Sequence, residues 1–265
     1  MEARHWNRIA RNYHAEVISP FQEGVENPLP GALGRLRGAH RLDVVEYGCG
    51  TGSLLPLLSA RFRHVTAIDF SGAMLAEARK RGAGRNVTFL RQDLRALSSL
   101  RERFDVAVVV NSVLAPDPRD VSRILDGIFG SLRPGGRLLG VFPAMEPVVY
   151  QAMLIFEEEI ESDREEKRAL SRTRRRLERS KFNFELGLFN EGGLQQKFFY
   201  QFEIAWRLRR AGFRGIRFGK VLYPWDAERI GYEIFPDAPP MWDWFVRARK
   251  PGGPRRARPA PGPKP

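Results

Sequence analysis

The sequence predicts an α/β fold built on a doubly wound, seven-stranded and mostly parallel sheet. Between residues 41 and 144, short apolar runs recur roughly every 20 to 30 residues, as parallel strands buried on both faces do. Segments with helical character lie between these runs, which indicates right-handed crossover connections. A chain of 265 residues with 43% hydrophobic residues is long and apolar enough to bury a sizeable core.

The elements follow one another along the chain with one interruption. The expected strands are 42–47, 65–69, 87–90, 104–110 and 136–142, and after the interruption 213–218 and 241–250. The expected helices of this rhythm are 74–81, 121–132 and 198–211, the last of them closed by Gly212. Together these runs supply the seven strands of the predicted sheet.

The chain divides into a helical cap (1–40), a main domain (41–250) with an insert (145–200), and a tail (251–265). The tail is basic and rich in Pro and Gly, with no apolar side chain larger than Ala, so it is expected to be disordered.

The insert interrupts the alternation of strands and helices after the fifth strand. It begins with an apolar-faced helix near 148–160, continues into a charged helix, and ends in a hairpin that turns at 190–193. One alternating face of the first hairpin strand is expected to carry Phe182, Phe184, Leu186 and Leu188, and the other Asn183, Glu185, Gly187 and Phe189. An insert here would stand over the carboxyl edge of the sheet, where ligands bind, as a lid that selects the ligand. Packing on a helix or at a dimer interface is the alternative.

The formal net charge of +13 is concentrated in three segments. Residues 164–181 hold nine Lys/Arg against three Glu, and 207–220 and 251–265 hold six and four basic residues with no acid. Such segments are the electrostatic footprint of a polyanion binder, although the rest of the chain is slightly acidic. Docking of RNA or of a protein through the arginine-rich segment 172–181 and the tail therefore stays open.

Several classes of protein are excluded by residue usage. A single cysteine cannot form an internal disulfide, and four scattered histidines without nearby thiols offer no metal spacing, so no metal is expected. The charged N-terminus does not resemble a secretory signal, and no run of about 18 apolar residues could cross a membrane. We expect a soluble protein in a reducing compartment, the cytoplasm.

The strongest motif is a strand that ends in an acid and passes through three alternating glycines into a helix: Glu46-Tyr-Gly48-Cys-Gly50-Thr-Gly52. Glycine lets a ligand approach the backbone closely there, and the following helix adds the positive end of its dipole. The spacing is neither a dinucleotide fingerprint, which would need glycine at Ser53, nor a P-loop, which would need Gly-Lys-Ser/Thr.

Two further acids follow the next strands at the same edge of the sheet. Asp69 closes the second strand, where an acid can accept both hydroxyls of a ribose, and Asp93 follows the third strand, where it could meet an adenine amino group. Either acid alone could be a simple turn residue. Acids at successive strand ends beside a glycine loop indicate a nucleoside site.

With these motifs, residues 41–144 resemble a class I, Rossmann-like S-adenosylmethionine-dependent methyltransferase. The glycine loop matches the first motif of that family, Asp69-Phe-Ser-Gly-Ala-Met74-Leu the second, and Gln92-Asp93-Leu94 the third. Phe104 to Ser112 fits the fourth strand and Leu132-Arg-Pro-Gly-Gly136 the turn into the fifth. The resemblance implies that the cofactor is S-adenosyl-L-methionine.

The resemblance also implies roles for individual residues. Gly48, Gly50 and Gly52 would line the methionine part of the cofactor, with Cys49 as a small spacer. Asp69 would hold the ribose, Phe70 and Met74 would flank the adenine, Asp93 and Leu94 would meet its edge, and Asn111 would close the site. Met74 could instead only pack on the sheet.

The leader carries Trp6, Ile9, Tyr13 and Val17 at helical spacing, and similar leaders cover the cofactor in small-molecule methyltransferases. Candidates for a catalytic group are weak: His14, Tyr200 and Glu203.

The resemblance implies methyl transfer by direct in-line displacement, in which a general base is optional. The fourth strand lacks the Asn/Asp-Pro-Pro-aromatic motif typical of enzymes acting on exocyclic adenine or amide nitrogens, so a small or medium-sized organic acceptor is expected. The alternatives are an RNA or protein methyltransferase, or a non-catalytic cofactor-binding regulatory protein. The acceptor atom and the oligomeric state are not encoded in any motif.

Overall fold

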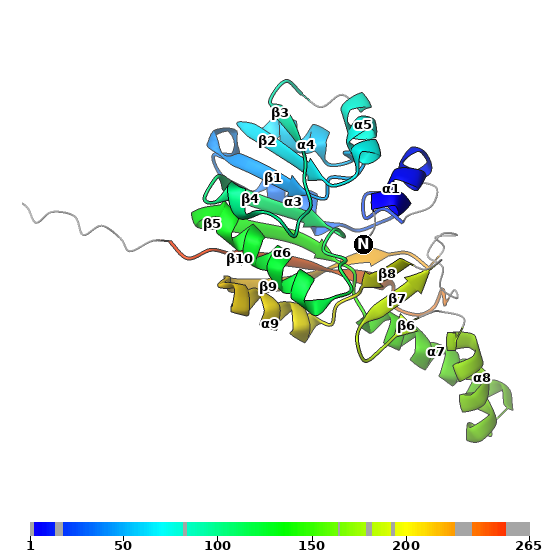
Figure 1. Ribbon diagram of the computed structural model, residues 1–265. Coiled ribbons are helices and arrows are strands. Elements are labelled where there is room, and N and C mark those ends of the chain that lie inside the picture. Colours follow the sequence, from blue (N-terminus) through cyan, green and yellow to red (C-terminus); the bar gives the residue numbers. More distant parts are fainter. Residues whose placement is uncertain are drawn as a thin grey trace, which may run out of the picture.

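The computed structural model describes residues 3–13, 18–81, 84–163, 165–178, 182–191, 194–225 and 235–252 (Figure 1). Its main sheet has seven strands in the order β3-β2-β1-β4-β5-β10-β9. All neighbours from β3 to β5 pair in parallel, and β10 pairs antiparallel with both β5 and β9. The predicted doubly wound, mostly parallel sheet is therefore confirmed.

The strands lie close to their predicted positions. Their bounds are β1 Asp43–Tyr47, β2 His64–Asp69, β3 Val87–Arg91, β4 Phe104–Val110, β5 Leu132–Phe142, β9 Arg214–Tyr223 and β10 Met241–Arg249. Two strands are longer than predicted. β5 already pairs at Leu132, before its Pro-Gly-Gly turn signal, and β9 continues to Tyr223 because β10 pairs along nearly all of its length.

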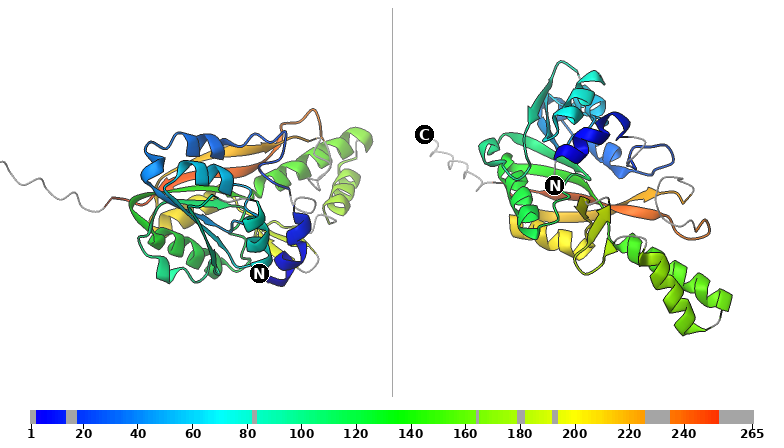
Figure 2. Two further views of the ribbon diagram at one scale, coloured as in Figure 1. Left: turned by 90° about the horizontal axis from the view of Figure 1, so that it is seen from above. Right: turned by 45° about the vertical axis from the view of Figure 1, so that its right-hand side comes forward.

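Helices cover both faces of this sheet, as Figure 2 shows. One layer contains α3 Pro28–Gly34, α4 Leu55–Arg61 and α5 Gly72–Lys80, and the other contains α6 Pro118–Ser131 and α9 Gln201–Ala211. Side chains cap three of these helices: Asn27 for α3, Ser71 for α5 and Asp117 for α6 each accept a hydrogen bond from a backbone N–H. Short 3-10 helices lie at Ala10–Asn12, Ala39–Arg41 and Ser98–Leu100.

The central strands divide their side chains between the two layers. Val44, Val106 and Val108 pack in the core under α3 and α4, while Val45 and Val109 pack in the core under α6 and α9. All five are fully buried. Strands β1 and β4 thus bury apolar side chains on both faces, which explains their hydrophobic runs.

The insert forms a helical pair and a small sheet at one end of the molecule. Helices α7 Glu146–Asp163 and α8 Glu166–Glu178 project from the body (Figures 1 and 2). Arg176 of α8 joins them through ion pairs to Glu158 at 2.7 Å and Glu159 at 2.8 Å. Strands β6 Phe182–Asn183, β7 Leu188–Glu191 and β8 Leu194–Lys197 follow as an antiparallel sheet.

The prediction of one long first hairpin strand was wrong. Residues 184–187 form a turn, which Gly187 allows with φ +62°, so the segment folds back into β6 and β7. Phe182 consequently pairs with Phe189, with ring centroids 4.8 Å apart, although strict alternation placed them on opposite faces. Leu186, in the turn, is 61% exposed instead of covering a cavity.

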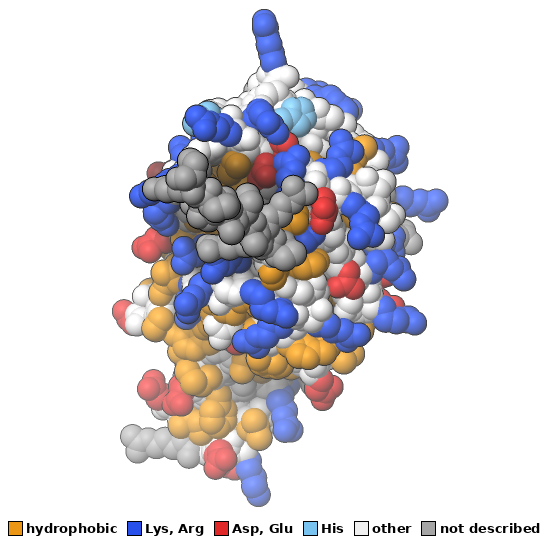
Figure 3. Space-filling model, turned by 90° about the vertical axis from the view of Figure 1, so that its left-hand side faces the viewer, with side chains coloured by type: hydrophobic (Ala, Val, Ile, Leu, Met, Phe, Trp, Pro, Cys, Tyr) orange, Lys and Arg blue, Asp and Glu red, His pale blue; other side chains and the backbone are white. Residues whose placement is uncertain are grey.

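Lys and Arg side chains are spread over the end of the molecule seen in Figure 3, with Asp and Glu side chains between them. Within the described ranges, no helix is long and apolar enough to cross a membrane. Most of the basic tail, residues 253–265, lies outside the described residues.

Candidate active site

A pocket opens at the carboxyl ends of β1, β2 and β4. In a doubly wound sheet this is the edge where ligands bind, because the strand order reverses beside β1. The residues that line it are Trp6, Tyr13, Gly48, Gly50, Asp69, Phe70, Met74, Asp93, Leu94, Arg95, Val110, Asn111, Ser112, Leu114, Ala115 and Ile124.

The glycine loop forms the floor of the pocket after β1. Gly48, Gly50 and Gly52 have φ of +69°, +53° and +81°, a region that favours glycine. A Cβ at Gly48 would lie 2.3 Å from the Cβ of Ser112, and one at Gly52 would press on Ala78 of α5, whereas one at Gly50 would meet nothing within 4 Å. The loop therefore needs glycine for packing at Gly48 and Gly52, and at Gly50 it leaves space open for a ligand.

Asp69 joins this loop to the start of α5. Its Oδ2 accepts a hydrogen bond from the Gly50 N–H and its Oδ1 one from the Ser71 N–H, both at 2.9 Å. Burial raises the pKa of this carboxyl, and the backbone N–H donors oppose that shift. Asp69 is 5% exposed and lines the pocket, as a ribose-binding acid should.

A second carboxyl, Glu46, lies directly before the glycine loop. It is 3% exposed, and its Oε2 has no hydrogen-bond partner within the described part of the chain. Burial, with a smaller contribution from the charge of Asp69, raises the pKa of Glu46 to about 8. Burial, Asp69 and Glu46 together raise the pKa of the Tyr13 phenol to about 12, so this phenol stays neutral beside the two acids.

The leader covers the pocket, as its helical stripe predicts. Trp6 of α1 (Ala3–Ile9) and Tyr13 line the pocket, and Ile9 packs with Met74 of α5. Asn7 fixes this arrangement, since its Oδ1 accepts a hydrogen bond from the Ser71 hydroxyl at 2.6 Å. Met74 therefore both packs against the leader and lines the pocket. Val17 of the predicted stripe and His14 lie outside the described residues.

The remaining predicted adenine contacts also meet at the pocket, with one addition. Phe70, Asp93 and Leu94 line it. The Asp93 carboxylate is paired with Arg95 at 2.6 Å, and Arg95 lines the pocket too. Sequence reasoning missed Arg95, although a basic residue two positions after a strand-end acid was a visible signal.

Asn111 directly follows β4 and lines the pocket, as expected of a residue that closes the site. Its φ is +45°, which Asn tolerates better than most residues. Its Nδ2 donates a hydrogen bond to Asp243 of β10 at 2.9 Å, a partner 132 residues further along the chain. No local signal in the sequence links these two positions.

Other predicted residues lie away from the pocket lining. Glu46, Cys49 and Gly52 are not among the lining residues, and Cys49 is buried as a spacer in the loop. The Tyr200 hydroxyl donates to the Phe184 carbonyl at 2.7 Å, and the Glu203 carboxylate pairs with Lys197 and Arg207, each at 2.8 Å. The structure does not bring Tyr200 or Glu203 to the site.

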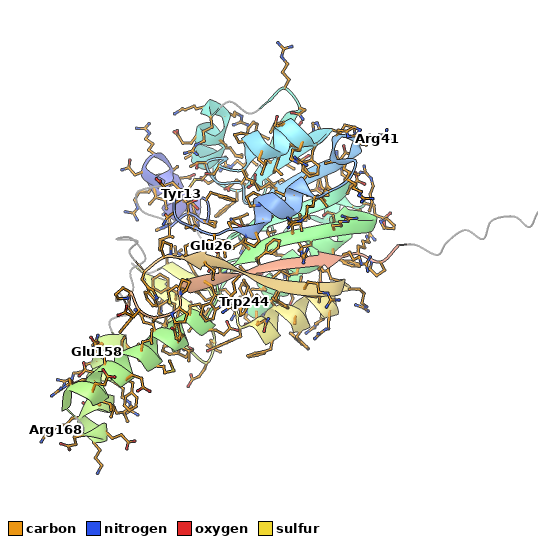
Figure 4. All side chains as sticks on the ribbon, turned by 180° about the vertical axis from the view of Figure 1, so that it is seen from behind. Tyr13, Glu26, Arg41, Glu158, Arg168 and Trp244 are labelled. Atoms are coloured by element: carbon orange, nitrogen blue, oxygen red, sulfur yellow. The ribbon has the colours of Figure 1, made fainter. Side chains whose placement is uncertain are left out.

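The expected lid also differs from the structure. No described residue of 145–200 lines the pocket, because α7 and α8 run outward instead of folding over it. In Figure 4, Glu158 and Arg168 lie on this projecting pair, far from Tyr13. The cover of the described pocket is the leader.

The geometry fits a nucleoside cofactor with a positively charged end. The glycine loop leaves room beside Gly50, Asp69 can accept ribose hydroxyls, and Glu46 offers a buried, unpartnered oxygen. Among the described residues there is no cluster of three or more His, Cys, Asp or Glu that could hold a metal ion.

Comparisons with known proteins agree with this architecture. Residues 44–136 match the family model of a methyltransferase domain. A malonyl-[acyl-carrier protein] O-methyltransferase of Bacillus anthracis is 32% identical over 139 residues, 51% of this chain and 50% of that protein. A ubiquinone biosynthesis O-methyltransferase of Coxiella burnetii is 30% identical over 137 residues, 50% of this chain and 54% of that protein. The chain spans about half the length of the curated relatives it matches.

A solved structure extends the likeness to nearly the whole chain. The 1,6-didemethyltoxoflavin-N1-methyltransferase of Burkholderia thailandensis superposes with a TM-score of 0.58 at 17% identity, covering 94% of this chain and 88% of that one. At this identity the likeness concerns the fold. The fold is that of the class I, Rossmann-like S-adenosylmethionine-dependent methyltransferases, and residues 44–136 match a methyltransferase domain.

Proposed function

We propose that this chain binds S-adenosylmethionine in the pocket and transfers its methyl group to a small or medium-sized organic acceptor by direct in-line displacement. The observation that carries the proposal is the convergence of Gly48, Gly50 and Asp69 on one pocket under Trp6 and Tyr13. When bound, the cofactor supplies a methyl group already activated by a sulfonium charge, and the sulfur keeps the electron pair of the broken bond.

The protein's own residues bind and orient. The Asp69 carboxylate would accept hydrogen bonds from the ribose, and Phe70 and Met74 would enclose the adenine, with Leu94 at its edge. The Asp69 carboxyl, which lines the pocket, favours a cationic ligand when it is ionised. Trp6 and Tyr13 exclude water from above, which strengthens these interactions.

A general base is optional in this chemistry. Aligning a nucleophile with an activated methyl group needs positioning more than proton abstraction. The names of the relatives support an organic acceptor group, since they refer to a malonyl group on an acyl-carrier protein, to ubiquinone biosynthesis and to 1,6-didemethyltoxoflavin.

Calorimetry with S-adenosylmethionine and S-adenosylhomocysteine tests the binding. Asp69→Ala should weaken both by about 1–3 kcal/mol through the loss of charge-assisted hydrogen bonds. Asp105→Ala is the matched control. Asp105 is an acid on a neighbouring part of the same sheet, near the amino end of β4. It accepts a hydrogen bond from the Asp43 N–H at 2.8 Å and pairs with Arg133 at 2.7 Å, away from the pocket. Unchanged affinity in a folded Asp69→Ala protein would refute the ribose assignment. Transfer is tested by following the formation of S-adenosylhomocysteine with a panel of hydroxylated, carboxylated and amine acceptors.

A further inference from the structure

Asp243 of β10 joins three separate parts of the chain, although it does not itself line the pocket. Its Oδ2 accepts hydrogen bonds from the Asn111 side-chain Nδ2 at 2.9 Å and from the Tyr223 hydroxyl at 2.7 Å, and its Oδ1 accepts one from the Ala144 N–H at 3.2 Å. These donors come from the end of β4, from β9 and from the segment after β5. A carboxylate with three donors is held in one orientation.

This carboxylate dictates which way the Asn111 amide points. A carboxylate only accepts hydrogen bonds, whereas an amide carries two N–H donors on one side and an oxygen on the other. Asn111 must therefore turn its Nδ2 toward Asp243, and its Oδ1 is turned elsewhere. That Oδ1 is buried and has no hydrogen-bond partner within the described ranges, on a residue that lines the pocket.

An unpartnered buried acceptor in a binding site calls for a donor from a ligand. Glu46 Oε2 is a second buried oxygen without a hydrogen-bond partner among the described residues. It lies on β1, the strand that pairs directly with β4, although Glu46 is not one of the pocket-lining residues. An ammonium group carries three N–H donors and a positive charge, so it can satisfy acceptors on two neighbouring strand ends. A hydroxyl carries a single donor.

We propose that Asp243 is a positioning residue for cofactor recognition: it holds the Asn111 amide so that Asn111 Oδ1 accepts a hydrogen bond from the ammonium group at the amino-acid end of the cofactor. The inference rests on the proposed function, since it requires S-adenosylmethionine in the pocket. The proposal adds Asp243 of β10 to a site whose lining residues all lie between Trp6 and Ile124.

The test compares S-adenosylhomocysteine with an analogue that lacks its α-amino group, by calorimetry. Wild type should prefer S-adenosylhomocysteine. In Asp243→Asn, the new amide can donate to Asn111 Oδ1 as well as accept from Nδ2, so the orientation is lost. Affinity for S-adenosylhomocysteine should then fall about 2- to 12-fold, the range expected for one hydrogen bond, while affinity for the analogue should not change.

Two further variants separate positioning from stability. In the double variant Asn111→Asp with Asp243→Asn, the amide and the carboxylate exchange places, so a carboxylate oxygen again faces the ligand and the preference should return. Tyr223→Phe removes a donor to the same Asp243 oxygen without releasing Asn111, and should keep the wild-type preference. If Asp243→Asn does not fold, Asn111→Gly provides an independent test. Glycine suits the backbone at φ +45°, and the variant lacks the amide, so its preference for S-adenosylhomocysteine over the analogue should be lost.

Wild-type behaviour in folded Asp243→Asn, or an equal loss for both ligands, would overturn the proposal, because a purely structural role cannot distinguish them. If wild type bound neither ligand, the proposed function itself would fail.

Discussion

The cofactor side and the insert side of this molecule are built on different principles. The pocket gathers residues from consecutive strand ends, namely Gly48, Asp69, Asp93 and Asn111, and a crossover fold brings such ends together automatically. The helices of the insert are held together by contacts that no sequence motif marks, such as the ion pairs of Arg176 with Glu158 and Glu159. We therefore expect substitutions in the glycine loop and at the strand ends to affect stability or binding strongly. Substitutions in the projecting helices α7 and α8 should have small effects.

The largest expected effect is at the glycine loop. Gly48→Ala should lower the free energy of unfolding by about 2–4 kcal/mol in urea titrations, because φ is +69° and the new Cβ would collide with Ser112. Adding Ser112→Gly should recover part of this loss. Gly50→Ala, with open space at its Cβ, should cost less stability but should weaken S-adenosylhomocysteine binding. Equal stability losses in the two alanine variants would contradict the assignment of packing to Gly48 and ligand space to Gly50.

Glu46 should make stability depend on pH. The Glu46 pKa is about 8 in the folded protein against its ordinary 4.5, so the folded state binds the extra proton between these values. The free energy of unfolding contributed by Glu46 should therefore fall as pH rises from about 4.5 to about 8, by at most about 1.4 kcal/mol per pH unit. Glu46→Gln should remove this slope in urea unfolding measured at several pH values. An identical slope in the variant would show that other groups cause it.

The leader should respond to ligand while the insert should not. Hydrogen exchange in residues 3–13 should slow when S-adenosylhomocysteine binds, because Trp6 and Tyr13 line the pocket. Asn7→Ala removes the acceptor for the Ser71 hydroxyl and should reduce that protection. Slowed exchange in α7 and α8 instead would restore the insert as the lid.

The smallest effect is expected on the insert itself. Arg176→Ala breaks ion pairs between partly exposed side chains, so it should lower the free energy of unfolding by no more than about 0.5–1 kcal/mol. S-adenosylhomocysteine affinity should equal that of wild type. A loss of affinity would indicate that the helical pair communicates with the pocket.

The cofactor pocket could be predicted from the sequence more completely than the insert. The strands and most of the cofactor residues are marked by short local patterns, such as glycines after an apolar run and Asp69 at a strand end. The turn at 184–187 was missed because alternation in residues 182–189 suits one strand as well as two, and Gly187 gave the only local sign of a bend. Asp243 was missed because its role arises from pairing between strands far apart in sequence.

The position of β10 between β5 and β9 has a consequence for the order in which the protein can assemble. During synthesis, β1 to β5 and the glycine loop emerge well before residues 241–249, so a parallel half-sheet can collapse while the edge of β5 is still unpaired. The last strand must then enter between β5 and β9, and its entry brings Asp243 to Asn111. Asn111, which lines the pocket, therefore gains its Asp243 partner only after residue 243 has been synthesised, so the orientation of its amide depends on the docking of β10.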